Sequence, residues 1–567
     1  MKDTDKTLCR IVLDVMQAHG VEEIVVSPGS RNAPILISAS YRKDLKCHIS
    51  TDERDAAFLA LGLATVSQKP VALACTSGTA LYNYAPAIAE AFYRKIPLVV
   101  VSADRPSPWI DQNDSQTLIQ PGALEKIVKK SFDIPVGEDG KDAGWFADRV
   151  ANEAMLLAVD GLPGPVHINL QFDAPLSGTI DNSPGNTRVI QAIKPTPFLS
   201  RKVIEAISLD LKGKKIWVVA GFMNPDDTLN RSIAQFSSLP GVVVICETLS
   251  NLHLPGNPYA VDTVLAALPD KLKNEVRPDL VISIGGALVS RMLKEYIREM
   301  EVESWTLGDT YLGVDCFKTL SRNIGIPPSA FFKALFRPMS NTYRNDPEAA
   351  APLKEYQHRW EEIKTLQTDC KELFVDEADW SELKAFRYIL RNIPAGYNLF
   401  LSNGTCVRYA QLFTKNIPHA SYCNRGVSGI EGTNLTAAGC AMAYKGPTLL
   451  LSGDMSFAYS PGVMGLDGLP RSFKIIVVNN KGGGIFRFIS PTRYIEHRDR
   501  FFCADPHLPL ERLAEAYGWR YLKAGSEADL EREFKRLIDC ESKAVLEIFS
   551  DEEYSASILR KYMRIGI

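Results

Sequence analysis

Short runs of apolar, often β-branched residues alternate with amphipathic stretches along the whole chain. Most runs are apolar from end to end, as expected for strands of a parallel sheet covered on both faces. The stretches between them, such as residues 55–67 and 383–391, carry apolar residues at helical spacing. This alternation predicts βαβ units and an α/β fold. Strands are predicted at residues 23–27, 71–76, 98–102, 166–170, 216–220, 242–246, 280–284, 399–402, 449–452, 475–479 and 545–549.

Two segments interrupt the alternation and are predicted to be linkers. Residues 177–200 are rich in Pro, Gly, Asn and Thr, and residues 338–352 contain Pro, Asn, Ser and a run of Ala. They divide the chain into domains at residues 1–180, 190–340 and 365–567. Three domains suit a chain of 567 residues at the usual domain size.

Three strand ends of the first domain recur in the third domain, at offsets of 375, 375 and 377 residues. Matches at so constant an offset predict two doubly wound parallel-sheet domains of similar topology that flank a different α/β domain. In such sheets ligands bind beyond the carboxyl ends of the strands, where these polar turns lie. The matched segments are 26–29 and 401–404, 76–78 and 451–453, and 100–102 and 477–479.

Composition narrows the kind of protein but not its chemistry. A hydrophobic content of 46%, a charged content of 23% and a net charge of −3 suit a soluble protein and do not favour nucleic acid as a partner. The eleven cysteines include no CxxC pair, which suits a reducing compartment. The chain begins without a signal-peptide core, and no apolar run approaches the ~20 residues of a membrane span. We therefore expect a cytoplasmic protein without a membrane span.

Some familiar sites are disfavoured by the sequence. The eight histidines include no HxxxH or HxH pair, which argues against a zinc site. There is no Walker A run, and no GxGxxG follows the first predicted strand. The central domain, residues 190–340, carries no strong adenine-nucleotide signal, so its role as an FAD site, an effector site or a packing domain stays open.

Two polar turns in the third domain predict a metal ion that holds a diphosphate. Asp454 and Asn480 each follow a predicted strand and lie 26 positions apart. Carboxylate, amide and backbone carbonyl oxygens are hard ligands of the kind Mg²⁺ takes. We predict a Mg²⁺ site formed by Asp454, Asn480 and the carbonyl of Gly482, with N–H groups after Gly453 facing phosphate. The alternative is two ordinary turns, with Asp454 as a helix N-cap.

Two other features leave alternatives open. Glu53 precedes a helix of small residues, and is either an exposed first-turn residue favoured by the helix dipole or a partner of a cofactor shared by the two related domains. The glycine-rich segment 482–486 carries Ile485 and Phe486. It is either a lid over a cofactor or a connection whose bulky residues lie in the core.

Several arginines follow predicted strand ends. One such arginine is usually a surface salt bridge. Several at one sheet edge indicate a substrate with more than one carboxylate, because a guanidinium binds a carboxylate through two hydrogen bonds. The arginines are Arg31, Arg105, Arg408, Arg425 and, in the central domain, Arg291.

The two polar turns resemble the metal motif of the thiamine diphosphate (ThDP) enzymes, in which Gly-Asp-Gly is followed by Asn-Asn. Here the motif reads Gly453-Asp454-Met455 and Asn479-Asn480, so Met455 stands in place of the second glycine. Glu53 matches the glutamate that activates the cofactor in these enzymes. Their order of pyrimidine-binding, central and diphosphate-binding domains fits the three domains predicted here.

Longer strings resemble the MenD family, the 2-succinyl-5-enolpyruvyl-6-hydroxy-3-cyclohexene-1-carboxylate (SEPHCHC) synthases of menaquinone biosynthesis. The strings SPGSRNAP at residues 27–34 and NRGVSGIEG at residues 424–432 are specific to this family. Residues 51–58, 76–80 and 102–106 match it as well. Arg291 stands where the family often has lysine.

The resemblance implies decarboxylation of 2-oxoglutarate and 1,4-addition of the resulting succinyl-semialdehyde carbanion to isochorismate, with ThDP and Mg²⁺ (or Mn²⁺) as cofactors. It implies that Glu53 is catalytic and favours the imino tautomer of the pyrimidine ring, and that Ile430 holds the cofactor bent. The implied cofactor-binding residues are Glu53, Ser402, Asn403, Ser428, Gly429, Ile430, Gly453, Asp454, Met455, Ser456, Asn480 and Ile485. The implied substrate-binding residues are Ser30, Arg31, Arg105, Gln116, Arg291, Asn403, Arg408, Arg425, Ile485 and Phe486. The implied metal ligands are Asp454, Asn480 and Gly482.

In this superfamily the cofactor lies between the first domain of one chain and the third domain of another. The resemblance therefore implies a homodimer or homotetramer with the active site at the subunit interface.

One alternative function is that of another ThDP enzyme, such as a 2-oxoacid decarboxylase or acetohydroxyacid synthase, which would use pyruvate without isochorismate. The number of arginines argues against it. A second is a non-catalytic ligand-binding protein, which the presence of Glu53, Asp454 and Asn480 opposes.

Overall fold

The computed structural model describes residues 2–137, 141–181, 187–254, 260–308, 313–413 and 418–567. The chain folds into two compact units. The first comprises Met1–Lys194, Asn424–Thr448 and Tyr459–Phe473, and the second comprises Pro195–Cys423, Leu449–Ala458 and Lys474–Ile567. Among the described residues, no helix combines the length and the apolar character that crossing a bilayer requires.

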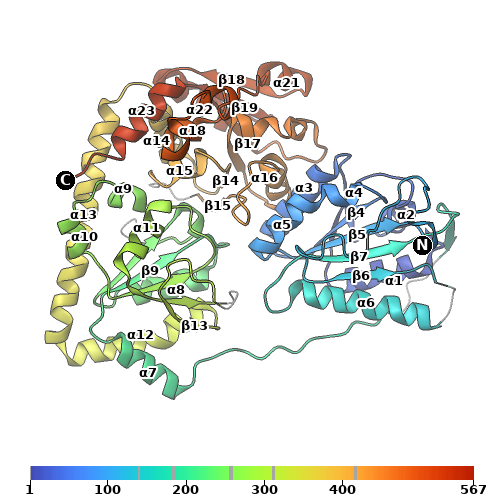
Figure 1. The fold of residues 1–567 in the computed structure, drawn as a ribbon, viewed down its shortest axis with the longest axis horizontal. Coiled ribbons are helices and arrows are strands. Elements are labelled where there is room, and N and C mark those ends of the chain that lie inside the picture. The colour runs from blue at the N-terminus through green and yellow to red at the C-terminus, as the bar shows by residue number, and fades with distance from the viewer. Residues whose placement is uncertain (1, 138–140, 182–186, 255–259, 309–312, 414–417) are drawn as a thin grey trace. The chain divides into compact units, whose positions relative to one another are not determined.

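The first unit is built on a six-stranded parallel sheet in the order β3-β2-β4-β5-β7-β6. Every residue of β4 and β5 is buried, which explains their continuous apolar runs. Helices α1, α2 and α6 share a core with one face of the sheet, and α3 contacts β2, β4 and β5 (Figure 1). The strands are β1 (Lys2–Thr4), β2 (Glu23–Val26), β3 (Lys46–Ile49), β4 (Val71–Cys75), β5 (Leu98–Asp104), β6 (Ser131–Ile134), β7 (Val166–Gln171) and β8 (Thr179–Asp181). The helices are α1 (Thr7–Ala18), α2 (Ala33–Ser40), α3 (Glu53–Ser67), α4 (Ala80–Asn83), α5 (Ala85–Arg94), η1 (Ser107–Trp109), α6 (Lys141–Val159), α16 (Thr433–Ala443) and η3 (Pro461–Gly465).

Helices α3 and α16 of the first unit approach each other unusually closely. A Cβ atom at Gly62 would lie 2.1 Å from the carbonyl oxygen of Thr436, and one at Gly439 would lie 2.2 Å from that of Leu59. Only glycine fits at either position, because the obstacles are backbone atoms that no side-chain rotation moves. The small residues that the sequence carries on both helices therefore serve helix packing.

The second unit contains two further sheets. One has five parallel strands in the order β10-β9-β11-β12-β13, and the other has six in the order β15-β14-β16-β17-β19-β18. Buried hydrogen bonds join the two, since Asn251 donates to Ser421 O at 3.0 Å and accepts from Ser421 N at 2.7 Å. This explains why two domains predicted from the sequence form one compact unit.

The elements of the second unit follow in chain order. The strands are β9 (Ile216–Ala220), β10 (Val242–Cys246), β11 (Leu280–Ile284), β12 (Glu303–Leu307), β13 (Leu320–Ile324), β14 (Asn398–Leu401), β15 (Ala420–Tyr422), β16 (Thr448–Gly453), β17 (Phe473–Asn479), β18 (Arg520–Ala524) and β19 (Ala544–Phe549). The helices before β14 are α7 (Arg201–Leu211), α8 (Asp227–Ser237), η2 (Thr248–Ser250), α9 (Val261–Leu265), α10 (Asp270–Glu275), α11 (Arg291–Met300), α12 (Pro328–Asn345), α13 (Pro347–Glu377) and α14 (Glu382–Asn392). The later helices are α15 (Cys406–Ala410), α17 (Asp454–Ala458), α18 (Gly484–Phe488), α19 (Ser490–Arg493), α20 (Arg498–Phe501), α21 (Leu510–Ala516), α22 (Glu527–Ile538) and α23 (Glu552–Tyr562).

The two six-stranded sheets have the same topology. When the strands of each sheet are numbered in chain order, both sheets read 2-1-3-4-6-5, whereas the five-stranded sheet reads 2-1-3-4-5. The matched segments of the sequence lie within or directly after the first, third and fourth strands of each six-stranded sheet. The predicted fold of three parallel-sheet α/β domains, with similar topology in the first and third, is confirmed.

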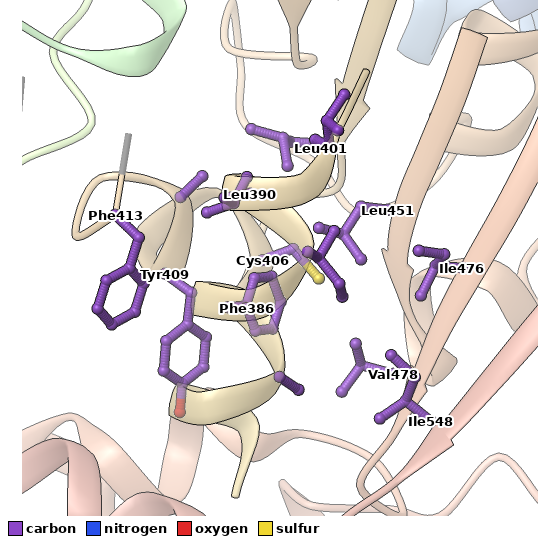
Figure 2. Packing of buried hydrophobic residues seen from close by; sticks show 14 of the residues in the cluster. Phe386, Leu390, Leu401, Cys406, Tyr409, Phe413, Leu451, Ile476, Val478 and Ile548 are labelled. Atoms are coloured by element: carbon purple, nitrogen blue, oxygen red, sulfur yellow. The ribbon is translucent and has the colours of Figure 1, made fainter. Parts of the chain in front are cut away.

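A buried core holds the strand ends of the third sheet in place. Figure 2 shows Phe386 of α14 and Tyr409 of α15, whose rings stack with centroids 4.6 Å apart, beside Leu451 of β16. Ile476 and Val478 of β17 belong to the same core, because alternate side chains of a strand point to one face. Truncating a ring such as Phe386 to alanine costs roughly 3–5 kcal/mol in a packed core. The turns after β16 and β17 therefore start from a rigid base.

The second predicted linker is wrong, because residues 338–352 are largely helical. Pro338 lies inside α12 and Pro352 inside α13. Asp346 separates the two helices, and its side chain caps α13 by accepting a hydrogen bond from Ala349 N at 3.1 Å. An internal proline removes one helical hydrogen bond but does not prevent a helix that buries an apolar stripe elsewhere.

The first predicted linker, residues 177–200, has three parts. Residues 179–181 form β8, which pairs antiparallel with β1. Residues 182–186 lie outside the described residues, and residues 187–200 form no helix or strand. Strands that the pattern missed are mostly edge strands such as β3 and β18, whose exposed positions break the apolar run.

Candidate active site

In the second unit, the carboxyl ends of β14, β16 and β17 lie side by side. Gly453 N donates to Ser402 Oγ at 3.2 Å, which ties the end of β16 to the end of β14. Asn403, the residue after Ser402, is also buried. No heavy atom lies within 4 Å of the position of a Cβ at Gly453, so a ligand has room to approach this backbone. A phosphate group fits such an open turn at the start of a helix, here α17.

The three predicted metal ligands are brought together at this edge. Asp454 Oδ2 accepts from Gly482 N at 2.8 Å, and Oδ1 accepts from Met455 N at 2.7 Å. Burial raises the pKa of Asp454, while the N–H groups of Gly482, Met455 and Asn480 oppose the shift. The three N–H groups leave part of the acceptor capacity of the carboxylate, about four lone-pair sites in all, for a further partner. A buried acceptor of this kind is stabilised by a cation, so the residues present fit a divalent metal ion.

Asn480 is held by a carboxylate that the sequence pattern did not indicate. Its Nδ2 donates to Glu382 Oε1 at 2.8 Å, and both side chains are buried. Burial raises the pKa of Glu382 to about 7, against the lowering effect of Asn480. Glu382 begins α14 rather than following a strand, so nothing in its local sequence pointed to the site.

The segment after Asn480 turns into a short helix whose bulky residues are half-buried. Gly483 is the left-handed N-cap of the short helix α18, which carries Ile485 and Phe486 half-buried. The Phe486 ring contacts the Phe502 ring at a centroid distance of 5.6 Å. The carbonyl of Gly482 accepts from Arg487 Nη1 at 3.0 Å, which leaves its second lone pair for a cation.

Met455 and Ser456 both lie in α17, directly after Asp454. Met455 has no positive φ, so the backbone there does not need the glycine of the ThDP-enzyme motif. Ser456 is buried, whereas Met455 is half-buried. The one departure in the metal motif is therefore sterically compatible with the fold.

Two predicted substrate arginines, Arg408 and Arg291, lie in the second unit. Arg408 lies on α15 and donates to Gly404 O. Arg291 is the first residue of α11, where its exposed side chain pairs with Glu295 at 2.6 Å. Asp262 accepts from Ser290 Oγ, the residue before Arg291. Burial raises the pKa of Asp262, and the hydrogen bond from Ser290 and the charge of Arg408 oppose the shift.

In the first unit, Glu53 and four predicted substrate residues gather at the carboxyl ends of β2 to β5. Glu53 is the first residue of α3, whose N-cap Asp52 accepts from Asp55 N at 3.1 Å. Burial raises the pKa of Tyr84, and the nearby charge of Glu53 adds to the shift. Arg31 N donates to Thr76 Oγ1 at 3.2 Å, which ties the turn after β2 to the end of β4. Ser30, Arg105 and Gln116 lie on neighbouring turns, Ser30 and Gln116 with exposed side chains.

Arg31 and Arg105 form an electropositive pair. The pKa of Arg31 is lowered by burial and then by the charge of Arg105. Arg105 is partly neutralised by Asp114, with Nη1 and Oδ2 at 2.6 Å. Burial raises the pKa of the adjacent Asp104 to about 6. An anionic ligand between the two guanidinium groups would relieve their repulsion.

The segment that carries Arg425, Ser428, Gly429 and Ile430 also belongs to the first unit. The buried carboxylate of Glu90, on α5, accepts from Gly426 N and Val427 N, both at 2.7 Å. Gly432 has φ +70° and lies so close to Phe58 that a Cβ would be 2.2 Å from the ring. The segment is thus anchored at both ends, beside the helix that starts at Glu53. Glu90 was missed because Glu90 and Arg94 have the spacing of an ordinary exposed helix pair.

Comparison with known proteins identifies the family. Residues 6–124 match the N-terminal TPP binding domain of thiamine pyrophosphate enzymes, and residues 402–548 match the C-terminal one. A 2-succinyl-5-enolpyruvyl-6-hydroxy-3-cyclohexene-1-carboxylate synthase of Porphyromonas gingivalis is 38% identical over 99% of this chain and 97% of its own length. The chain belongs to the SEPHCHC synthase family.

Other SEPHCHC synthases are similar over the same extent. That of Bacteroides fragilis is 34% identical over 99% of both chains, and that of Flavobacterium johnsoniae is 33% identical over 98% of both. The predicted membership of this family and of the thiamine pyrophosphate enzymes is confirmed. The protein is therefore an enzyme of the thiamine pyrophosphate-dependent transferases.

Each TPP binding domain match falls on one of the two sheets of like topology and covers most of its strands. The N-terminal match includes β2 to β5 and Glu53, and the C-terminal match begins directly after β14 and includes β15 to β18, most of β19, Asp454 and Asn480. The five-stranded sheet lies outside both matches. Among the described residues, no group of three His, Cys, Asp or Glu side chains forms a metal site. The predicted metal set has only one such residue, so it depends on amide and carbonyl oxygens.

Proposed function

We propose that this protein is a SEPHCHC synthase of menaquinone biosynthesis. It decarboxylates 2-oxoglutarate and adds the resulting succinyl-semialdehyde carbanion to isochorismate in a 1,4-addition. The observation that carries the proposal is the 38% identity to a synthase of that name across the whole chain. The grouping of the predicted residues at the carboxyl edges of two related sheets supports it.

ThDP and Mg²⁺ (or Mn²⁺) are the proposed cofactors, and ThDP supplies an electron sink for loss of CO₂ when it is bound. Asp454, Asn480 and the carbonyl of Gly482 would hold the metal ion. The open backbone at Gly453 and the buried Ser402 and Asn403 would receive the diphosphate. The positive charge of the metal ion would offset the cost of burying the Asp454 carboxylate, and the diphosphate would balance the rest of that charge.

Glu53 is the proposed catalytic residue. A carboxylate at the start of α3 is stabilised by the helix dipole and is only half-buried, so it can reach a bound ring nitrogen. Its charge would favour the tautomer in which that nitrogen carries a proton. Ile430 is proposed to support the cofactor from the segment that Glu90 anchors.

The arginines are the proposed carboxylate ligands. Both proposed substrates carry more than one carboxylate, and a guanidinium is the side chain best suited to bind one. Arg31 and Arg105 already repel each other in the first unit, and would bind an anion with little reorganisation. Arg425, Arg408, Arg291, Ser30 and Gln116 complete the proposed set.

Ile485 and Phe486 are proposed to exclude water from the reacting groups. Both are half-buried, and the ring of Phe486 is held against Phe502. Loss of CO₂ disperses negative charge, so a site with little water favours the step. A carbanion is also protected from protonation there, which favours its addition to the second substrate.

The assembly, location and domain limits are further parts of the proposal. By analogy with the ThDP enzymes, we propose a homodimer or homotetramer with the active site at the subunit interface, in the cytoplasm. Domain limits at residues 1–180, 190–340 and 365–567 are kept, with the correction that residues 338–352 are helical. Gel filtration that gives a stable, active monomer would contradict the assembly.

The proposed reaction is tested by incubating the purified protein with ThDP, Mg²⁺, 2-oxoglutarate and isochorismate. We expect release of CO₂ and a new cyclohexene adduct, detected by mass spectrometry. Pyruvate in place of 2-oxoglutarate is the control for a simpler 2-oxoacid decarboxylase. Turnover of pyruvate with no adduct from isochorismate would overturn the proposal.

The role of Glu53 is tested by Glu53→Gln, which keeps the shape of the side chain and removes the charge. We expect turnover to fall by roughly 10²–10⁴-fold, the usual range for a group that moves a proton. Binding of ThDP, followed by quenching of tryptophan fluorescence, should stay close to that of the wild type. Unchanged turnover would contradict the assigned role.

A further inference from the structure

The side-chain amide of Asn480 has two ends of similar shape and opposite chemistry. Its oxygen is a metal ligand, whereas its NH₂ group is a donor that a cation repels. The strand end places this amide at the site, but the backbone does not decide which end faces the cation. Some neighbouring group must select the orientation.

Glu382 is placed to make that selection. The ionised carboxylate of Glu382 only accepts hydrogen bonds, so in this form it binds the NH₂ end of Asn480, at 2.8 Å from Nδ2 to Oε1. The oxygen of the same amide is then left for another partner. With exposed fractions of 3% for Glu382 and 4% for Asn480, water does not compete for either group.

Glu382 is itself held in one position. It is the first residue of α14, where the helix dipole favours a carboxylate. Its backbone N–H donates to Ser555 Oγ at 3.2 Å, and the hydroxyl of Tyr409 also bonds its side chain. The ring of Tyr409 is in turn stacked on that of Phe386, which lies on α14 like Glu382. The orientation of Asn480 is therefore set by the rigid core shown in Figure 2.

The neighbouring residue supplies a natural comparison. Asn479 donates from Nδ2 to Glu547 Oε1 at 2.7 Å, and Glu547 is also buried. Tyr521 OH donates to the other oxygen of Glu547 at 2.7 Å. Both asparagines thus bind a buried carboxylate that a tyrosine hydroxyl supports, but Glu547 lies on β19 and holds that strand to β17. Only Asn480 belongs to the predicted metal set.

We infer that Glu382 is a positioning residue of the metal site, which fixes the oxygen of Asn480 toward the cation. The inference rests on the proposed function, since the metal ion is part of that proposal. Residues that orient a metal ligand typically contribute 10–100-fold to metal affinity. The isosteric change Glu382→Gln lets the amide of Asn480 bind in either orientation, and it should weaken the metal by about that factor.

The test measures the affinity of the full-length protein for Mn²⁺ by electron paramagnetic resonance, with ThDP at saturation. We expect the dissociation constant to rise roughly 10–100-fold in Glu382→Gln and to stay within about twofold of the wild type in Glu547→Gln. At saturating Mn²⁺, turnover by Glu382→Gln should recover most of the wild-type rate. Asp454→Asn, which removes a ligand, should abolish specific binding.

Two results separate the inference from the proposal beneath it. Mn²⁺ binding by Glu382→Gln that equals that of the wild type and of Glu547→Gln would overturn the inference alone. A wild-type protein that binds Mn²⁺ no more tightly with ThDP than without it would overturn the proposed metal site. If Glu382→Gln does not fold, Glu382→Asp gives the same test, because it keeps the charge but draws the carboxylate back from Asn480. Unchanged Mn²⁺ affinity in Glu382→Asp would also overturn the inference.

Discussion

Gly62 and Gly439 meet where α3 lies against α16, and the variant Gly62→Ala tests this contact. On the existing backbone, the new Cβ would lie 2.1 Å from Thr436 O and 2.8 Å from Cys440 N. A carbon and a carbonyl oxygen in contact are normally about 3.3–3.6 Å apart, so the helices must separate by about 1 Å. Both obstacles are backbone atoms, so the strain spreads over the helix pair.

The cost follows from two opposing effects. Overpacking of this kind typically costs ~1–3 kcal/mol, and a gap of 0.5–1 Å forfeits roughly a quarter to a half of the dispersion attraction across the rest of the interface. Alanine is better than glycine inside a helix by about 1 kcal/mol. We expect the free energy of unfolding of the first unit to fall by roughly 2 kcal/mol, or its midpoint by about 4–8 °C.

Gly144 in α6 is a matched control for this substitution. A Cβ there would meet only the end of the Ile11 side chain, at 3.5 Å, which is ordinary contact. Gly144→Ala should therefore leave the midpoint unchanged or raise it, since only the gain in helix propensity remains. Differential scanning calorimetry of the wild type and both variants makes the comparison. A midpoint for Gly62→Ala equal to or above that of the wild type would refute the close contact.

Two other predictions concern buried ionisable side chains in the first unit. Glu90→Gln removes the charge that holds Gly426 N and Val427 N. It should lower the free energy of unfolding, measured by urea denaturation, by roughly 2–4 kcal/mol. The control is Glu22→Gln, which breaks an exposed pair with Lys69, and a loss in Glu90→Gln no larger than in this control would contradict the anchoring role. Burial lowers the pKa of His167 from 6.5 to about 4, so the unfolded chain binds more protons between these values, and stability is lost as the pH falls from 6.5 toward 4. When the pH falls from 7 to 5, the free energy of unfolding of His167→Gln should drop by about 2 kcal/mol less than that of the wild type. Asp104, with its pKa raised to about 6, acts in the opposite direction but is present in both proteins. Equal losses in thermal unfolding at the two pH values would exclude His167 as the cause.

Much of the fold follows from the pattern of apolar residues. A strand covered on both faces is apolar throughout, so buried strands such as β5 and β17 stand out without any knowledge of their partners. Edge strands such as β18 alternate with exposed positions and were missed. Proline content was a poor guide at residues 338–352, because helices α12 and α13 bury enough apolar surface to tolerate Pro338 and Pro352.

The candidate site divides in the same way. The placement of Asp454 and Asn480 at one sheet edge, and of Glu53, Arg31 and Arg105 at another, could be predicted because parallel strands bring their carboxyl ends to the same edge of a sheet. Their roles stay predictions. Glu382 and Glu90 could not be predicted. Each lies on a helix with no special sequence pattern and bonds a residue more than ninety positions away in the chain. The same holds for Gly62 and Gly439, which look like ordinary small residues until two helices meet.

The amino-acid sequence by itself determined the class of fold, the duplication of a strand order and the chemistry of the polar turns, because each of these depends on residues that are local in the chain. Tertiary structure alone decided which carboxylate orients Asn480, which one anchors the segment of Arg425 and Ile430, and where backbones touch. Those contacts join segments that are distant in the chain, and hydrophobic periodicity reports how deeply a residue is buried but not what it is buried against.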